Sequence, residues 1–368
     1  MQIAVTKKLA DAMEVKPLPA DNSADPLFSW TATWTNTFSN RKEDMVVMIN
    51  NATQFTVLIY GVRKNQFRDI SKKMTDAIRD TFLAMNINPE VVDEYLKQAG
   101  EIQWCVNSDR KLTACMNSRG LDSARVIGNK VNKSQDKMKY NDTLGRLVST
   151  LIVNYSNNSN DSYIPEEKMK TALIELTGKP LYKYPAFELL VTLDLCVYKA
   201  TRRLIVPSDM LFSDFHKLLQ KVFDWKNYHM YEFIILDSKG QKPVTHIVND
   251  EESLDYLRNA VAEEGLKLSD YFPVNKYMKY IYDMGDYWEH KVKLIRVIEQ
   301  HNEESPYLLE AVGQAPPEDV GGVGGFIEFR EIMLNPKHPE YDEIKEWAGY
   351  WSTELSEWES RPRVIHVW

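Results

Sequence analysis

Two short acidic segments in the second half of the chain carry residue types that bind divalent metal ions. The first segment reads Tyr-Asp-Met-Gly-Asp-Tyr-Trp-Glu-His over 282–290, and it offers Asp283, Asp286 and His290 within eight residues. Carboxylate oxygens and imidazole nitrogens suit magnesium, manganese or zinc. We therefore treat these three side chains as candidate ligands of a divalent metal.

The same residues also fit a tight hairpin turn between two strands. Gly285 would take the positive φ that such turns need, and Asp283 and Asp286 would accept hydrogen bonds from turn amides. Alternate residues of a strand share a face, so Asp286 and His290 could converge around Trp288, which would otherwise simply pack. Aspartates in turns usually serve the backbone, which favours the structural interpretation.

The second acidic segment is Pro-Pro-Glu-Asp-Val-Gly-Gly-Val-Gly-Gly over 316–325, ahead of a predicted helix. A glycine-rich loop before a helix can bind phosphate through its exposed amides. No Lys-Ser/Thr pair follows, and the strand–loop–helix context of a dinucleotide site is missing. Glu318 and Asp319 repel a bare phosphate unless a cation bridges, so a rigid Pro-Pro entry with a glycine exit is favoured. Both residues remain candidate metal ligands.

His229 and Glu232 form a further candidate pair, after Trp225 in a predicted strand. Residues three apart in a strand point to opposite faces, so these two are poor partners for one metal. No His-Glu-x-x-His, Gly-x-Ser-x-Gly or Cys-His-Asp arrangement occurs in the chain. A complete catalytic set is therefore missing from the sequence, and whether the protein is an enzyme stays open.

Charge is distributed unevenly along the 368 residues. Residues 1–155 carry 21 Lys+Arg against 17 Asp+Glu, whereas 156–368 carry 24 against 36, for a net charge of −8 overall. An acidic second half repels a nucleic-acid backbone, which disfavours nucleic acid as its partner. The basic segment 119–139 could bind nucleic acid.

The sequence also bears on the compartment. No run approaches the roughly eighteen apolar residues of a membrane span, and the N-terminus begins with a strand-like pattern instead of a signal peptide. Cys105, Cys115 and Cys196 lie far from any Cys-x-x-Cys spacing. This argues against a disulfide framework and a thiolate zinc site. We expect a cytoplasmic protein without a membrane partner.

Periodicity predicts two α+β domains that would position these segments. The first domain is expected at 1–120, where a strand at 30–38 alternates with Trp30 and Trp34 on one face, and a helix at 66–85 repeats apolar residues at helical spacing. Residues 121–180 carry a polar, weakly periodic pattern and are expected to form a partly helical linker region.

The second domain is expected at 181–352, with a C-terminal tail at 353–368. It opens with a strongly alternating strand at 187–197, a partner strand at 202–206, a helix from Ser213 and a strand at 229–236. The order strand–strand–helix–strand is the opening order of a β-grasp-like α+β fold.

These residues together carry a family resemblance. The segment from Tyr184 to about Trp351 resembles the plasmid pRiA4b open-reading-frame-three-like family, whose members are often labelled insertion-element passenger or resolvase-like proteins. The matching pieces, in order, are Arg202-Arg-Leu-Ile-Val-Pro207, Trp225 with His229-x-x-Glu-Phe233, Tyr282-Asp-x-Gly-Asp-x-Trp-Glu-His290, Pro316-Pro-Glu-Asp-x-Gly-Gly322, and His338-Pro-Glu340 with Trp347. Residues 1–115 look like a second, bacterial domain-of-unknown-function family.

The resemblance implies an α+β domain from bacterial and mobile-element neighbourhoods, with no established reaction. Several positions depart from the family pattern. Val320 stands where the family usually has Cys, and Gly324 where it usually has Trp; Ala200-Thr201 replaces part of a Pro-x-Trp motif, and Met284 replaces Phe. A thiolate role at 320 is therefore untenable in this protein, and one wall of any family pocket is in doubt.

Three functional hypotheses follow. The first is a binding or regulatory module of a plasmid, phage or defence-type locus, which grips a protein or a small ligand. The second is a metal-dependent hydrolase or phosphodiesterase acting on nucleotides or nucleic acid, in which metal-bound water is the nucleophile. Its ligands would be drawn from Asp283, Asp286, His290, Glu318 and Asp319. The third is nucleic-acid binding through 119–139.

Overall fold

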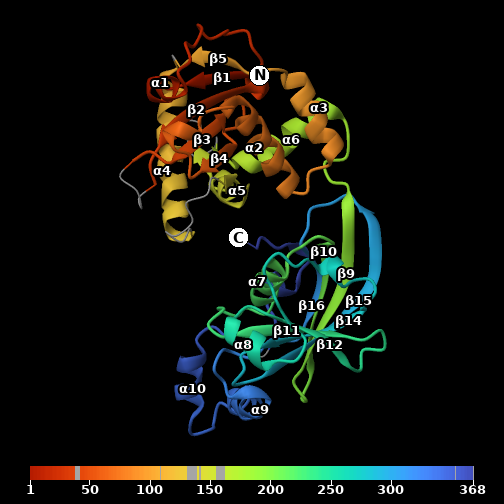
Figure 1. The fold of residues 1–368 in the computed structure, drawn as a ribbon. Coiled ribbons are helices and arrows are strands. Elements are labelled where there is room, and N and C mark those ends of the chain that lie inside the picture. The colour runs from red at the N-terminus through yellow and green to blue at the C-terminus, as the bar shows by residue number, and fades with distance from the viewer. Residues whose placement is uncertain are drawn as a thin grey trace. The chain divides into compact units, whose positions relative to one another are not determined.

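The computed structural model describes residues 1–37, 42–107, 109–130, 139–140, 142–154, 162–352 and 354–367. The chain divides into two compact units, Met1–Lys183 (unit 1) and Tyr184–Trp368 (unit 2). Each unit has its own sheet and its own helices (Figure 1), which confirms the predicted two-domain α+β class. Among these residues, no helix is both long enough and apolar enough to cross a membrane.

Unit 1 is built on a six-stranded sheet in the order β5-β1-β2-β3-β4-β6. β1 is parallel to β2 and β5, and the remaining pairs are antiparallel. Its strands are β1 (Gln2–Val5), β2 (Ser29–Thr35), β3 (Met45–Asn50), β4 (Thr56–Tyr60), β5 (Gln103–Val106) and β6 (Lys139–Tyr140), beside a small pair of β7 (Val153–Asn154) and β8 (Ser162–Tyr163). Its helices are α1 (Lys7–Met13), α2 (Ile70–Ala84), α3 (Pro89–Ala99), α4 (Arg110–Lys130), α5 (Asp142–Ser149) and α6 (Pro165–Thr177).

Trp30 lies in the core of unit 1. Its side chain is fully buried and donates a hydrogen bond to the Tyr95 hydroxyl at 3.0 Å, while Trp34 packs edge-on against Phe67. The alternation at 30–38 thus reflects a buried sheet face, as the sequence favours, although residues 38–41 lie outside the described part of the chain.

The stretch 121–180, which we expected to be a linker region, belongs to unit 1 where it is described. The end of α4 and all of α5 and α6 bury apolar side chains, for example Ile127, Val148 and Leu173. The sequence did not indicate this packing, because polar residues of these helices pair with one another inside the fold. Buried Glu166 accepts a bidentate ion pair from Arg146 on α5. In the basic segment 119–139, Arg119 is buried and donates to the Val148 carbonyl, and 131–138 lie outside the described residues.

Unit 2 is built on a nine-stranded sheet in the order β13-β12-β11-β14-β15-β9-β10-β16-β17. Its strands are β9 (Tyr184–Asp194), β10 (Lys199–Pro207), β11 (Tyr231–Leu236), β12 (Pro243–Val248), β13 (Ala260–Ala262), β14 (Tyr277–Tyr282), β15 (Trp288–His301), β16 (Tyr307–Val312) and β17 (Arg363–Val364). Its helices are α7 (Phe212–Val222), α8 (Glu251–Tyr256), α9 (Gly322–Met333), α10 (Tyr341–Ala348) and α11 (Glu357–Ser360). The opening order β9, β10, α7, β11 is the predicted one.

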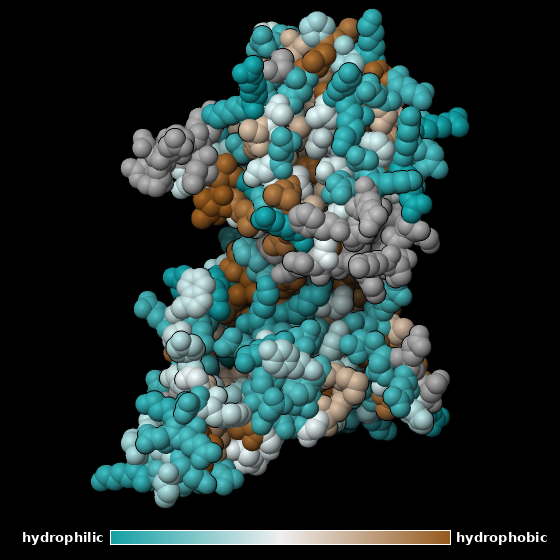
Figure 2. Space-filling model, turned by 90° about the vertical axis from the view of Figure 1, so that its left-hand side faces the viewer, coloured by the Kyte–Doolittle hydropathy of each residue, from teal (hydrophilic) through white to brown (hydrophobic). Residues whose placement is uncertain are grey.

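The core of unit 2 lies between α7 and one face of the sheet. Apolar residues at alternate positions of β9, such as Leu189 and Val191, share a buried cluster with Phe215 and Leu219 of α7. The residues after 352, expected to form a tail, contribute β17, which pairs with β16 at the sheet edge. On the face shown in Figure 2, hydrophilic side chains predominate and hydrophobic ones occur in small groups, as expected when the apolar faces are packed inward.

This core also contains a buried polar side chain from α7. His216 of α7 is buried, accepts a hydrogen bond from the Tyr280 hydroxyl at 2.8 Å and donates one to Asn227 Oδ1 at 2.7 Å. Desolvation lowers the pKa of His216 to about 4, so the ring is neutral in the folded protein at neutral pH.

Candidate functional site

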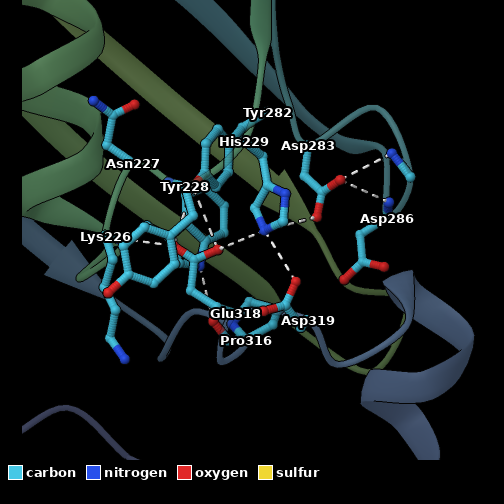
Figure 3. A network of polar contacts seen from close by, with 12 residues as sticks. Lys226, Asn227, Tyr228, His229, Tyr282, Asp283, Asp286, Pro316, Glu318 and Asp319 are labelled. Carbon is cyan, nitrogen blue, oxygen red and sulfur yellow. Dashed lines mark hydrogen bonds and ion pairs between the residues drawn. The ribbon is translucent and has the colours of Figure 1, made fainter.

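Both acidic segments meet at one end of the unit 2 sheet. The first forms the turn from β14 to β15, and the second forms the loop between β16 and α9 (Figure 3). The backbone N–H of Gly321 donates to Asp286 Oδ2 at 3.1 Å. Gly322, at φ +66°, approaches the same turn so closely that a Cβ there would lie 2.8 Å from the Asp286 carbonyl oxygen. A glycine at 322 is therefore what allows the two loops to touch.

A third segment, 225–230 between α7 and β11, brings His229 to the place where the two loops meet. Its Nε2 atom lies 3.0 Å from Asp319 Oδ1, 3.6 Å from Asp283 Oδ2 and 3.7 Å from Glu318 Oε2. Figure 3 shows the imidazole pointing into the gap between these carboxylates. Three chain segments thus contribute one nitrogen and three oxygens to one point, and we call these four residues the His229 cluster.

The distances of 3.0–3.7 Å from His229 Nε2 to the three carboxylate oxygens are close to the spacing of metal ligands. One ligand atom each from His229, Asp283 and Asp319 fits within a mutual separation of 4.8 Å. Bonds of about 2.0–2.2 Å to a common ion would place neighbouring ligand atoms roughly 3–3.5 Å apart. In the described part of the chain, the buried Nε2 atom of His229 has no hydrogen-bond partner, because none of the nearby oxygens is aligned to accept from it. The nitrogen points between the oxygens, as a metal ligand would.

The two carboxylate oxygens of Asp283 make different contacts, one with the turn and the other with the cluster. Oδ1 accepts from the backbone N–H groups of Gly285 at 2.9 Å and Asp286 at 3.3 Å, whereas Oδ2 faces His229. The residue is buried and adopts a left-handed conformation at φ +58°. The turn interpretation is therefore confirmed for Oδ1, but the positive φ expected at Gly285 is adopted by Asp283 and Tyr287 instead. The metal-ligand interpretation of Asp283 stays a prediction.

The two carboxylate oxygens of Glu318 also make different contacts. Oε1 accepts from the Lys226 backbone N–H at 2.7 Å and from the Tyr282 hydroxyl at 3.1 Å, and Oε2 lies nearer His229. The Tyr282 hydroxyl also accepts from the Tyr228 N–H at 3.1 Å, so one phenol joins the 225–230 segment to the acidic loop. Burial, and next the Glu318 charge, raise the pKa of Tyr282, which keeps the hydroxyl protonated as a donor.

Asp319 lies on the solvent-exposed side of the cluster. Its side chain is 64% exposed, whereas those of Asp283 and Glu318 are about nine-tenths buried. Asp319 adopts φ +59° within the turn that leads to the glycines. An ion held here would face solvent on the Asp319 side, which leaves room for water or a substrate.

Asp286 takes a structural position beside the cluster. Its carboxylate accepts from Gly321, the residue that caps the N-terminus of α9. A carboxylate at that place offsets the positive end of the helix dipole. The first turn of α9 is therefore already paired with an anion, which agrees with the structural interpretation of the glycine-rich loop.

His290 and Trp288 point away from the cluster, contrary to the convergence we expected around Trp288. Both lie on the core face of β15, and His290 donates from Nδ1 to the carbonyl oxygens of Trp288 at 3.0 Å and Tyr280 at 3.2 Å. Complete burial lowers the pKa of His290 to about 3. The strand begins only at Trp288, so Asp286 belongs to the turn and shares no strand face with His290.

Glu232 also lies elsewhere. It is on the sheet face opposite the core, where its Oε2 pairs with His246 Nδ1 at 3.1 Å. His229 and Glu232 are indeed not partners, but the strand argument misplaced His229. β11 begins at Tyr231, and a left-handed Asn227 at φ +57° sets the direction of the loop before it. Tyr282 and Trp225 also belong to the site, although the sequence placed them only in the matching family segments and did not predict a role for either.

Comparison with known proteins places both halves of the chain. Residues 185–360 match the family model described as "Plasmid pRiA4b ORF-3-like protein", and residues 2–168 match "Domain of unknown function (DUF6933)". The "Uncharacterized protein y4hQ" of Sinorhizobium fredii (strain NBRC 101917 / NGR234) is 38% identical over 167 residues, which is 43% of this chain and 78% of that protein. The crystal structure of a protein of unknown function, MM3350 from Methanosarcina mazei Go1, aligns at 32% identity over 47% of this chain and 95% of that one, with a TM-score of 0.42.

All four residues of the His229 cluster lie within the matched residues 185–360. The matched families and relatives carry no named reaction, so the chemistry must be argued from the site. Through unit 2 the chain belongs to the plasmid pRiA4b ORF-3-like family, and its N-terminal part carries a DUF6933 domain.

Proposed function

We propose that unit 2 binds a divalent metal ion through the His229 cluster and uses it to hydrolyse phosphoesters. The observation that supports this proposal is that three carboxylate oxygens lie within 3.0–3.7 Å of one imidazole nitrogen, which has no hydrogen-bond partner. An imidazole among carboxylates suits manganese or zinc better than calcium or magnesium, which prefer oxygen ligands alone.

The open geometry of the cluster supports the hydrolytic part of this proposal. A divalent ion lowers the pKa of a bound water towards neutrality and polarises a phosphoryl oxygen. The exposed Asp319 side leaves space for both water and substrate, whereas Asp283 and Glu318 are fixed by their second oxygens. The protein would thus contribute a rigid inner side and an accessible outer side.

The test measures metal binding first and turnover second. We expect the full chain to bind Mn²⁺ or Zn²⁺ in isothermal titration calorimetry and to cleave bis(p-nitrophenyl) phosphate only when loaded. Asp283→Asn preserves the turn-facing oxygen and removes the charge that faces His229, so we expect at least a tenfold loss of metal affinity, by analogy with the roughly 10–100-fold cost of disturbing metal-site partners. His229→Ala should behave alike.

His246→Ala is the matched control, because it breaks a second histidine–carboxylate pair of unit 2 outside the cluster. Metal affinity should be unchanged in that variant. Failure of the unaltered protein to bind either ion, or an equal loss in His246→Ala, would contradict the proposal. Binding without cleavage would remove only the hydrolytic part and leave a metal-organised binding module, our first hypothesis from the sequence.

A further inference from the structure

The segment Lys226–Met230, here called the 226–230 loop, is held rigidly beside the His229 cluster. Three successive backbone N–H groups have side-chain acceptors: Lys226 donates to Glu318 at 2.7 Å, Asn227 to Gln220 at 2.8 Å and Tyr228 to the Tyr282 hydroxyl at 3.1 Å. The residue before the loop, Trp225, donates from its indole to the Pro316 carbonyl at 2.9 Å. A loop with its amides satisfied in this way has one defined conformation.

This fixed loop directs one side chain inward and exposes its neighbours. His229 points into the cluster, whereas Tyr228 is 70% exposed and Met230 is 57% exposed. The Lys226 ammonium lies 5.8 Å from the centre of the Tyr228 ring. In Figure 3 that ring lies to the side of the Glu318 carboxylate, at the margin of the cluster. An exposed aromatic ring, with a lysine ammonium over it, thus stands next to a proposed metal site.

From this arrangement, and resting on the proposed metal site, we infer that the ligand of the site is a mononucleotide. Its phosphate binds the metal ion and the Lys226 ammonium, and its base stacks on Tyr228. A lysine serves as a mobile point charge for phosphate, and a fixed aromatic ring offers a stacking surface to any base. Because the 226–230 loop is already ordered, little conformational entropy is lost when the base stacks.

The negative charge of unit 2 favours a mononucleotide over a nucleic-acid strand as the ligand. Residues 184–368 contain 20 Lys+Arg and 32 Asp+Glu, a net charge of −12. A strand that extends beyond the site would bring further phosphates against this negative charge. The metal ion and Lys226 together offset the three carboxylates of the His229 cluster, so a single phosphate meets a site without excess negative charge, whereas each further phosphate meets the acidic surface.

The experiment compares ligands that differ only in the base. Using the Mn²⁺-loaded full chain, calorimetry measures the affinities for AMP and for ribose 5-phosphate. Stacking of one base predicts about a tenfold preference for AMP. Tyr228→Leu keeps an apolar side chain and the backbone hydrogen bond but removes the ring, so the ratio of the two affinities should fall towards one. Tyr256→Leu is the control, since Tyr256 is 80% exposed on α8; it should keep the preference.

Each outcome separates this inference from the proposal on which it rests. Absence of Mn²⁺ binding removes the metal site itself. Metal binding with equal affinities for AMP and ribose 5-phosphate, with no binding of either, or with a preference that survives Tyr228→Leu leaves the metal site and overturns the mononucleotide. Tighter binding of an oligothymidylate than of a mononucleotide, with a steep salt dependence, also overturns it in favour of single-stranded nucleic acid.

Discussion

At the scale of single residues, each buried carboxylate of the His229 cluster makes two kinds of contact. Asp283 holds its turn with one oxygen, and Glu318 holds the 226–230 loop with one oxygen, so the other oxygen of each is fixed towards His229. A carboxylate fixed in this way does not need to be ordered when an ion binds, which preserves affinity. The residue that links these contacts is Tyr282, because its hydroxyl contacts both Glu318 and the Tyr228 amide.

Tyr282→Phe tests this positioning role. The ring, which stacks on Trp225 with centroids 4.9 Å apart, is retained, but Glu318 loses a donor and the Tyr228 N–H loses its acceptor. We expect Mn²⁺ affinity to fall about tenfold, the lower end of the cost of removing a supporting hydrogen bond at a metal site. The measurement is calorimetric titration.

Tyr198→Phe provides the matched control, because the Tyr198 hydroxyl donates to the Gln314 carbonyl at 2.7 Å in the same unit. Both variants lose one phenolic hydroxyl, yet only Tyr282→Phe should lose metal affinity. Equal affinities in the two variants would show that Tyr282 has no positioning role.

At the scale of elements, the site depends on the contact between the β14–β15 turn and the N-terminus of α9. Gly321 and Gly322 adopt φ +91° and +66°, conformations that residues with side chains rarely adopt. Gly325 is required for a different reason, since a Cβ there would lie 2.0 Å from the Val320 carbonyl oxygen. The glycine-rich sequence thus serves close backbone packing.

Gly322→Ala should destabilise unit 2 by about 2 kcal/mol, because it combines the cost of a left-handed alanine with a 2.8 Å approach to the Asp286 carbonyl. Metal affinity should fall as well, since the turn that carries Asp283 must move. Denaturant unfolding and Mn²⁺ titration measure the two effects.

Gly324→Ala is the comparison on the same helix, since a Cβ at 324 meets nothing within 4 Å. Alanine is the better helix former by roughly 0.5–1 kcal/mol, so this variant should be neutral or more stable. If Gly324→Ala were as damaging as Gly322→Ala, close approach to Asp286 would not be the reason for the glycine at 322.

At the scale of the whole molecule, the two units differ in how they respond to pH. All seven histidines of the chain lie in unit 2. Two of them, His216 and His290, are neutral in the core with pKa values of about 4 and about 3. Their ordinary pKa in an unfolded chain is about 6.5. Between about pH 6.5 and 4 the unfolded state therefore binds protons that the folded state does not.

The stability of unit 2 should consequently be highest above about pH 6.5 and decline as the pH falls towards 4. Each buried ring contributes a slope of up to about 1.4 kcal/mol per pH unit in that window. Scanning calorimetry of the metal-free full chain at pH 7 and pH 5 measures the effect. The transition assigned to unit 2, identified as the one that Gly322→Ala shifts, should fall in temperature more than the transition of unit 1. Equal shifts of both transitions would contradict this account.

The sequence predicted the strands and helices whose apolar residues repeat at regular spacing. It predicted less where the conformation of a loop determines the direction of the chain. Alternation at 187–197 and helical spacing after Ser213 correspond to β9 and α7 because apolar burial dominates there. The region 121–180 was expected to be partly helical, but its packing into unit 1 was not predicted, because buried charges of its helices pair with one another, as Arg146 does with Glu166.

For the candidate site, the acidic segments indicated where to look but not which atoms meet. The structure brings Asp283, Glu318 and Asp319 to His229. That convergence depends on the left-handed Asn227 and on the residue at which β15 begins. Neither has a period that a sequence pattern could reveal. The sequence therefore placed His290 among the candidate metal ligands, whereas His229 was a candidate site residue but not a candidate ligand.

Trp225 has a consequence for spectroscopy. Its indole donates to the carbonyl of Pro316, two residues before Glu318, and its ring stacks on Tyr282. Any event that draws the acidic loop towards His229 must alter the surroundings of this indole. The fluorescence of Trp225 therefore reports on changes at the site without an added label. Comparison with a Trp225→Phe variant separates its signal from that of the other tryptophans.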